Sequence, residues 1–226
     1  MVLRWALLPF LAILASAMAT ELWQAIHRQM VSIATFRHPL VIAFAAGFAF
    51  RILFRALLRR FGKDDPLDFI DTLEHELTHA LVGYLTFSPP VSLSASLKSG
   101  GEVQLKGSNP LAVLAPYFLP LWCSLTLLFG LIVQSGMQTT WNRLIFFLLG
   151  CFIYRLAKEY RWRQSDLHIY GFLFSTLFVC IFLLLALGVI LDVRNLASWH
   201  WLIAAGRHAW HALPGVWAWT RVRLGF

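Results

Sequence analysis

The sequence predicts an all-α polytopic membrane protein with about five to six transmembrane helices and one small β-hairpin. Of its 226 residues, 59% are hydrophobic and only 13% are charged, whereas a soluble domain carries about 25% charged residues. Several apolar segments approach the length of about 20 residues that a helix needs to cross a bilayer. One segment between them alternates apolar and polar residues with a period of two, which indicates strands. This composition argues against a soluble enzyme and against a disordered chain.

Six segments are apolar enough to be membrane helices, although residues 144–154 are short for a full crossing. Residues 1–20 suit either a signal peptide with A-x-A sites or a first transmembrane helix, and we favour the retained helix. Within residues 111–133, Pro116 and Pro120 predict a kink. We expect one membrane domain over residues 1–226, whose apolar segments are residues 5–20, 40–58, 69–87, 111–133, 144–154 and 167–191.

The net charge of +8 comes with basic residues that cluster at the ends of apolar segments. This placement is typical of an anionic membrane surface, so we expect the lipid bilayer as a partner and no nucleic acid. The clusters at residues 59–63 and 155–163 should both be cytoplasmic by the positive-inside rule. Three full crossings between them would place them on opposite sides. Either residues 144–154 do not span fully, another segment re-enters, or the charge rule fails here.

The segment at residues 69–87 is the most informative part of the sequence. Six ionisable groups crowd its first half, namely Asp68, Asp71, Glu74, His75, Glu76 and His79. Such groups are costly at membrane depth and normally face a bundle interior or a water-filled cavity. The preceding segment ends in Arg51, Arg55 and Arg59, which share one helix face because they are four residues apart. These arginines either extend to the nearer membrane interface or pair with the acidic residues of the next helix.

Residues 91–106 predict a β-hairpin, because apolar and polar side chains alternate on both sides of a turn at residues 99–102. An exposed strand edge of this hairpin can bind an extended peptide through main-chain hydrogen bonds. The alternative is a plain connection between helices. Ser108, Asn109 and Pro110 then predict the N-cap and first residue of the next helix.

Residues 193–226 predict an interfacial tail, because tryptophan and arginine are frequent there, as they are at membrane surfaces. Pro214 and Gly215 should divide this tail into two pieces. His208 and His211 lie three residues apart, with no acidic residue nearby in the sequence. An interfacial helix face is therefore favoured over a metal-binding pair.

Residues 75–79 form the pattern H-E-x-x-H. On a helix, His75 and His79 share one face, so both imidazoles can reach a single zinc ion. Glu76 lies about 100° around the same helix and can contact a water on the metal. Zinc lowers the pKa of such a water towards 7, and the carboxylate accepts its proton. The pattern therefore predicts zinc-dependent hydrolysis of an amide bond.

A catalytic zinc usually has three protein ligands, so a third must come from elsewhere in the chain. Asp71 is too far along the helix axis to join both histidines, but it can accept a hydrogen bond from a ligand imidazole. The remaining candidates are Glu102, Glu159, Asp166 and His168. Asp166 is favoured because it opens a long apolar segment and can point back into a helix bundle. Its alternative role is that of a helix N-cap.

The sequence around this pattern resembles the site-2 protease family of intramembrane zinc metalloproteases, and most closely its minimal bacterial branch without a PDZ domain. The resemblance covers residues 64–191, the metalloprotease-like core, and rests on residues 73–81, 107–111, 114–120 and 164–167. It implies zinc held by His75, His79 and Asp166, with Glu76 as the catalytic base. The chain departs from the better-known members by lacking their L-D-G motif, which carries the third ligand.

The resemblance implies a multi-pass protein, in the inner membrane of a bacterium, that cleaves peptide bonds of membrane protein or peptide substrates. A membrane partner protein could supply the substrate selection that a PDZ domain gives elsewhere. Two other classes remain open. The first is a non-catalytic membrane scaffold or regulator that keeps the fold, and the second is a transporter whose buried groups move an ion. An intact Glu76 favours the enzyme, since a scaffold does not need the base.

Overall fold

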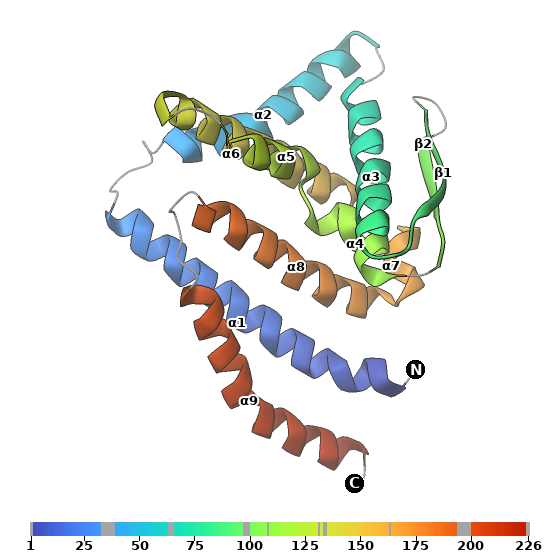
Figure 1. The fold of residues 1–226 in the computed structure, drawn as a ribbon, viewed down its shortest axis with the longest axis vertical. Helices are drawn as coiled ribbons and strands as arrows, with labels where there is room; N and C mark the ends of the chain where they lie inside the picture. The colour runs from blue at the N-terminus through green and yellow to red at the C-terminus, as the bar shows by residue number, and fades with distance from the viewer. Residues whose placement is uncertain are drawn as a thin grey trace. The chain divides into compact units, whose positions relative to one another are not determined.

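The structure is a computed structural model in which residues 2–32, 39–62, 66–96, 100–107, 109–130, 132, 135–162, 164–193 and 200–224 are described. It is helical apart from one β-hairpin (Figure 1). The elements in chain order are α1 (Val2–Ser32), α2 (Pro39–Arg60), α3 (Pro66–Leu85), β1 (Pro90–Ser96), β2 (Gly100–Leu105), α4 (Pro110–Phe118), α5 (Leu121–Gly130), η1 (Ser135–Met137), α6 (Gln138–Glu159), α7 (Ser165–Ile169), α8 (Phe172–Val193) and α9 (His200–Leu224).

The chain divides into two compact units, of which residues 36–166 form the one with the predicted metal site. Its longest helices, α2 and α6, pack along each other, because small residues let their backbones approach closely. A Cβ atom added at Gly47 of α2 would overlap the Phe147 carbonyl, and one at Gly150 of α6 would overlap the Phe44 carbonyl. Both glycines are therefore needed for this helix pair.

The hairpin lies beside α3 and is antiparallel, as the alternating pattern predicted (Figure 1). Gly100, Gly101 and Glu102 of the predicted turn instead belong to β2, where they pair with Ser96, Ala95 and Ser94. Residue 99 of the predicted turn lies outside the described residues. The expected helix start is confirmed: Asn109 caps α4 by accepting a hydrogen bond from the Leu111 N–H, and Pro110 follows.

The second unit comprises residues 1–35 and 167–226, in which α1 packs against α8 and α9. Its core contains small and large apolar side chains from all three helices, namely Met18, Leu22, Ala25, Ile181, Trp201 and Ala205. Trp201 is therefore a core residue, whereas Trp210 is exposed as expected for an interface. His208 has the acidic partner that the sequence did not suggest, because its Nδ1 lies 2.9 Å from Oε1 of the buried Glu21 in α1.

Among the described residues, three helical segments are long and apolar enough to cross a membrane: Leu7–His27, Pro39–Arg60 and Phe172–Leu191. The bent pair α4 and α5, which meet at 80°, makes four if it is one span. The chain thus has the helices of a membrane protein, but fewer spans than the five to six expected. Helices α3 and α6 are long enough, but over a membrane-length stretch they are too charged or too polar.

Two further expectations about single segments are wrong. Residues 167–191 do not form one helix, because Gly171 has a φ of 90° and separates α7 from α8. Pro214 does not divide the tail, since α9 continues through it. A proline removes one helical hydrogen bond, and the remaining bonds keep the helix intact. The kink predicted from Pro116 and Pro120 is present, because α4 and α5 meet at 80° on either side of Pro120. The prediction of a single domain stays untested.

Candidate metal centre

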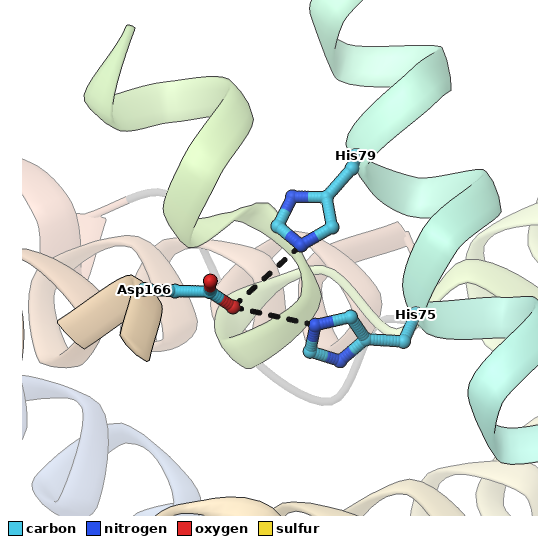
Figure 2. Close-up of side chains that lie close together, drawn as sticks. All are labelled: His75, His79 and Asp166. Carbon is cyan, nitrogen blue, oxygen red and sulfur yellow. Dashed lines mark ion pairs between the residues drawn. The ribbon is translucent and has the colours of Figure 1, made fainter. Parts of the chain in front are cut away.

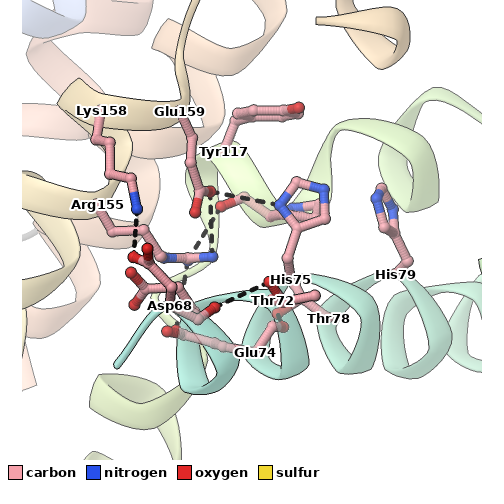
Figure 3. Close-up of polar contacts among 12 residues, drawn as sticks. Asp68, Thr72, Glu74, His75, Thr78, His79, Tyr117, Arg155, Lys158 and Glu159 are labelled. Atoms are coloured by element: carbon pink, nitrogen blue, oxygen red, sulfur yellow. Dashed lines mark hydrogen bonds and ion pairs between the residues drawn. The ribbon is translucent and has the colours of Figure 1, made fainter. Parts of the chain in front are cut away.

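The ionisable side chains of helix α3 lie on two different faces. Asp68, Asp71 and Glu74 are three residues apart and lie on one side, where they pair with cations from α2 and α6. Figure 3 shows Asp68 and Glu74 with the α6 cations Arg155 and Lys158. His75 and His79 are four residues apart and point to another side, towards α7. The ion pairs of the acidic face hold α3 against α2 and α6, whereas the histidine face carries the predicted metal ligands.

The acidic face confirms one of the two interpretations of the arginine stripe on α2. Arg51 forms a buried ion pair with Asp71, and Arg55 lies 3.5 Å from Asp68. Asp71 therefore pairs with an arginine, and the expectation that it accepts a hydrogen bond from a ligand imidazole is wrong. A buried carboxylate needs a partner charge, and the guanidinium of Arg51 is the nearest one.

Part of the second basic cluster lies inside the protein, and whether it is cytoplasmic stays untested. Arg155 of α6 is only 1% exposed. Its Nη2 lies 3.5 Å from Glu74 Oε1, and Lys158 Nζ donates to Asp68 Oδ1 at 2.5 Å. Residue 163 lies outside the described residues. Because these two cations neutralise acids of α3, they carry no information on which side of a membrane this end of α6 faces.

His75, His79 and Asp166 lie together, with one ligand atom from each within 4.8 Å of the others. Asp166 Oδ2 is 3.5 Å from His75 Nε2 and 3.7 Å from His79 Nε2 (Figure 2). These distances exceed the 2.7–3.2 Å of a normal hydrogen bond. They are close to the edge of a tetrahedron with metal–ligand bonds of 2.0–2.1 Å, which is about 3.4 Å. The spacing suits three ligands around one ion better than direct hydrogen bonds.

The outer nitrogens of both histidines face acceptors. His79 Nδ1 lies 2.8 Å from the Ala112 carbonyl oxygen, which can only accept, so Nδ1 carries the proton. His75 Nδ1 faces the Glu159 carboxylate, with 3.5 Å between Nδ1 and Oε2. When Nδ1 carries the only proton of an imidazole, the Nε2 lone pair is available to a metal ion between the histidines and Asp166. Metal-binding histidines usually donate the N–H of the other ring nitrogen to a carboxylate or a backbone carbonyl in this way.

Asp166 is the second residue of α7, and its contacts are those of a ligand rather than of a helix cap. Tyr117 of α4 donates its hydroxyl to Asp166 Oδ2 at 3.0 Å. Burial raises the pKa of Asp166, but the N–H groups that His75 and His79 direct at it when no metal is bound outweigh burial and lower the pKa below its usual range. Asp166 is thus a carboxylate at neutral pH, with a lone pair free for a cation.

Glu76 is 7% exposed and interacts electrostatically with all three residues of the group. Strand β2 covers it closely at Gly101. A Cβ atom added at Gly101 would lie 2.8 Å from Glu76 Oε1 and 2.8 Å from Thr72 Cγ2. Real Cβ atoms essentially never make contacts below 3.0 Å. A glycine at this position therefore allows the hairpin backbone to pass beside the carboxylate.

We expect Gly101→Ala to destabilise the protein by about 1–3 kcal/mol, which is the usual cost of overpacking a close contact. The added methyl group must push β2 away from α3 or move Glu76. Gly136→Ala is the matched control, because nothing lies within 4 Å of a Cβ atom there. The measurement is thermal unfolding of both variants in detergent. Equal midpoints would contradict the close approach of β2 to Glu76.

The structure separates the four candidates for the third ligand. Asp166 joins both histidines, whereas Glu159 lies behind His75. Glu102 is exposed on β2, where its Oε1 accepts a hydrogen bond from Gln104. Among the described residues, His168 is not part of a metal-binding group. Sequence reasoning assigned no role to Tyr117 or to the Ala112 carbonyl, although both lie in the proline-rich apolar segment before the kink.

No family model, curated protein or solved structure matches this chain. The site must therefore be interpreted from its own residues.

Proposed function

We propose that the chain is a membrane-embedded zinc metallopeptidase of the site-2 protease type, which hydrolyses peptide bonds of membrane proteins. The observation that carries the proposal is that Asp166 Oδ2 lies 3.5 Å from His75 Nε2 and 3.7 Å from His79 Nε2, two distances that suit neighbouring ligands of a tetrahedral ion. Two imidazoles and one carboxylate are a usual ligand set for catalytic zinc. Helix α3 carries two of these ligands in a chain with three helices that are long and apolar enough to cross a membrane. This supports a substrate within a bilayer, which in our proposal is the inner membrane of a bacterium.

The protein residues have separate tasks in this reaction. A bound zinc ion polarises a carbonyl group and lowers the pKa of water. Glu76 accepts a proton from the attacking water and passes it to the amide nitrogen as the C–N bond breaks. The water oxygen ends on the new carboxylate, and the proton ends on the new amine. Tyr117 holds Asp166 in place through the hydrogen bond to Oδ2.

The hairpin supports the choice of an extended peptide as substrate. A transmembrane helix has all its main-chain amides paired, so it must unwind before its peptide bonds can be cut. A strand edge offers the unwound stretch new hydrogen-bond partners. Strand β2 passes beside Glu76 at Gly101, so a peptide added to this hairpin is held near the base.

The proposal is tested with Glu76→Gln, which keeps the size of the side chain but removes the base. We expect the variant to bind zinc normally and to lose cleavage by at least about 100-fold, in line with the contribution of general-base catalysis. The probe is fluorescein-labelled casein in detergent, whose unfolded main chain is open to the site. Glu102→Gln is the control for loss of a negative charge.

Cleavage by the wild type should stop with a chelator and return with zinc. Equal cleavage by wild type and Glu76→Gln would contradict the proposal. A wild type that binds zinc but never cleaves the probe or a single-span membrane peptide would favour the non-catalytic scaffold instead.

A further inference from the structure

The two metal-facing histidines have unequal partners, and this difference is the basis of the inference. The backbone fixes His79, because the Ala112 carbonyl belongs to the first turn of α4. His75 instead depends on a side chain, the carboxylate of Glu159 at the end of α6. A carboxylate partner makes an imidazole a stronger metal ligand than a neutral carbonyl does, because it stabilises positive charge on the ring.

Glu159 is held in turn by Arg155, one helical turn earlier. The same carboxylate oxygen, Oε2, lies 3.5 Å from His75 Nδ1 and 3.7 Å from Arg155 Nη1 (Figure 3). The other end of the guanidinium, Nη2, lies 3.5 Å from Glu74 Oε1 and donates to the Pro116 carbonyl at 3.4 Å. Arg155 therefore contacts α3 and α4, the two helices that supply His75 and the partner of His79.

The charges explain why this arginine has to be present. Glu74 is buried and Glu159 is half-buried, and both lie within 4 Å of Arg155. Without the guanidinium, these two carboxylates would repel each other in a region of low dielectric constant. Glu159 would then turn away from Glu74, and His75 Nδ1 would lose its charged partner.

We propose that Arg155 is a positioning residue for the metal centre, which acts by holding Glu159 against His75 and so sets the zinc affinity of the site. Arg155 contacts no residue of the ligand group itself, and its effect passes through Glu159. The inference rests on the metal site of the proposed function but not on hydrolysis.

The test measures zinc affinity of the full chain in detergent, by competition with a coloured chelator. We expect Glu159→Gln to weaken binding about 10- to 100-fold, the usual effect of removing the partner of a metal-binding histidine. Glu102→Gln removes an exposed glutamate of β2 and should leave the affinity within twofold of wild type. Thermal unfolding without zinc should be the same for both variants, which separates positioning from folding.

Arg155→Lys then tests whether the arginine acts through Glu159. Lysine keeps the charge, but its single ammonium group cannot contact Glu74 and Glu159 at the same time as the two Nη atoms of a guanidinium do. We expect it to weaken zinc binding in the wild-type background and to have no further effect in the Glu159→Gln background. Effects of the two substitutions that multiply would overturn the proposal, as would an unchanged affinity in Glu159→Gln.

The cleavage assay keeps this inference apart from the proposed function. If zinc binding responds to Glu159→Gln and Arg155→Lys as expected but the wild type cleaves nothing, the positioning role stands and the peptidase proposal fails. If cleavage depends on Glu76 but Glu159→Gln binds zinc like wild type, the peptidase stands and the positioning role fails.

Discussion

We expect the detergent-purified chain to bind one zinc ion, and both His75→Ala and His79→Ala to lose it. Zinc sites in proteins draw about 10–16 kcal/mol from all their ligands together, so removing one imidazole costs several kcal/mol. We therefore expect the affinity to fall by more than about 100-fold in each variant. No other side chain is placed to replace the missing ligand, because within the described residues the group contains only His75, His79 and Asp166.

His168→Ala is the matched control, since it removes an exposed histidine that follows Asp166 by two residues. Its zinc content should equal that of wild type. The measurement is metal analysis by mass spectrometry after gel filtration. Full occupancy in either His75→Ala or His79→Ala would contradict the assignment, and loss of zinc in His168→Ala would bring that histidine back as a ligand.

The main helices of the metal-site unit could be predicted from sequence because their patterns are local. The apolar segment at residues 40–58 became α2, and the alternating residues became the hairpin. The kink between α4 and α5 followed from Pro116 and Pro120. The wrong predictions also concern single positions in the chain. Gly171 interrupts a segment that is apolar throughout, and Pro214 lies in a helix that tolerates it, because composition does not report these backbone conformations.

Part of the site was predictable for a similar reason. His75, Glu76 and His79 lie within one helical turn, so their spacing alone indicates a shared ion. Asp166 was ranked first among distant candidates by its place at the start of an apolar segment, and the structure brings it to the histidines.

The residues around the ligands were not predictable, because their partners are far away in the sequence. Tyr117 is 49 residues from Asp166, and the Ala112 carbonyl is 33 residues from His79. No periodic pattern connects such pairs. Asp71 was assigned to an imidazole because both lie on α3, but the nearest opposite charge comes from Arg51 on α2. The partner of Asp71 is therefore determined by an opposite charge on another helix and could not be predicted from the periodicity of α3.

Asp166→Asn separates a metal ligand from a helix cap, because asparagine caps helices as well as aspartate does. A neutral amide is a much poorer zinc ligand than a carboxylate, since it lacks the charge that attracts the ion. We therefore expect normal folding and a zinc affinity reduced by at least about 100-fold, with cleavage reduced alongside it. Asp166→Ala should lose zinc as well, and its loss of a cap would cost only about 1 kcal/mol.

Ser165→Ala is the control for this region of α7, because its hydroxyl contacts Asp166 Oδ1 at 3.3 Å while Tyr117 and the histidines face Oδ2. It should leave zinc binding unchanged. Circular dichroism reports the folding of each variant, and chelator competition reports its affinity for zinc. An Asp166→Asn protein that keeps wild-type affinity would show that the carboxylate is not a ligand. Retained zinc together with a lower unfolding midpoint in Asp166→Ala would instead assign Asp166 a role in folding alone.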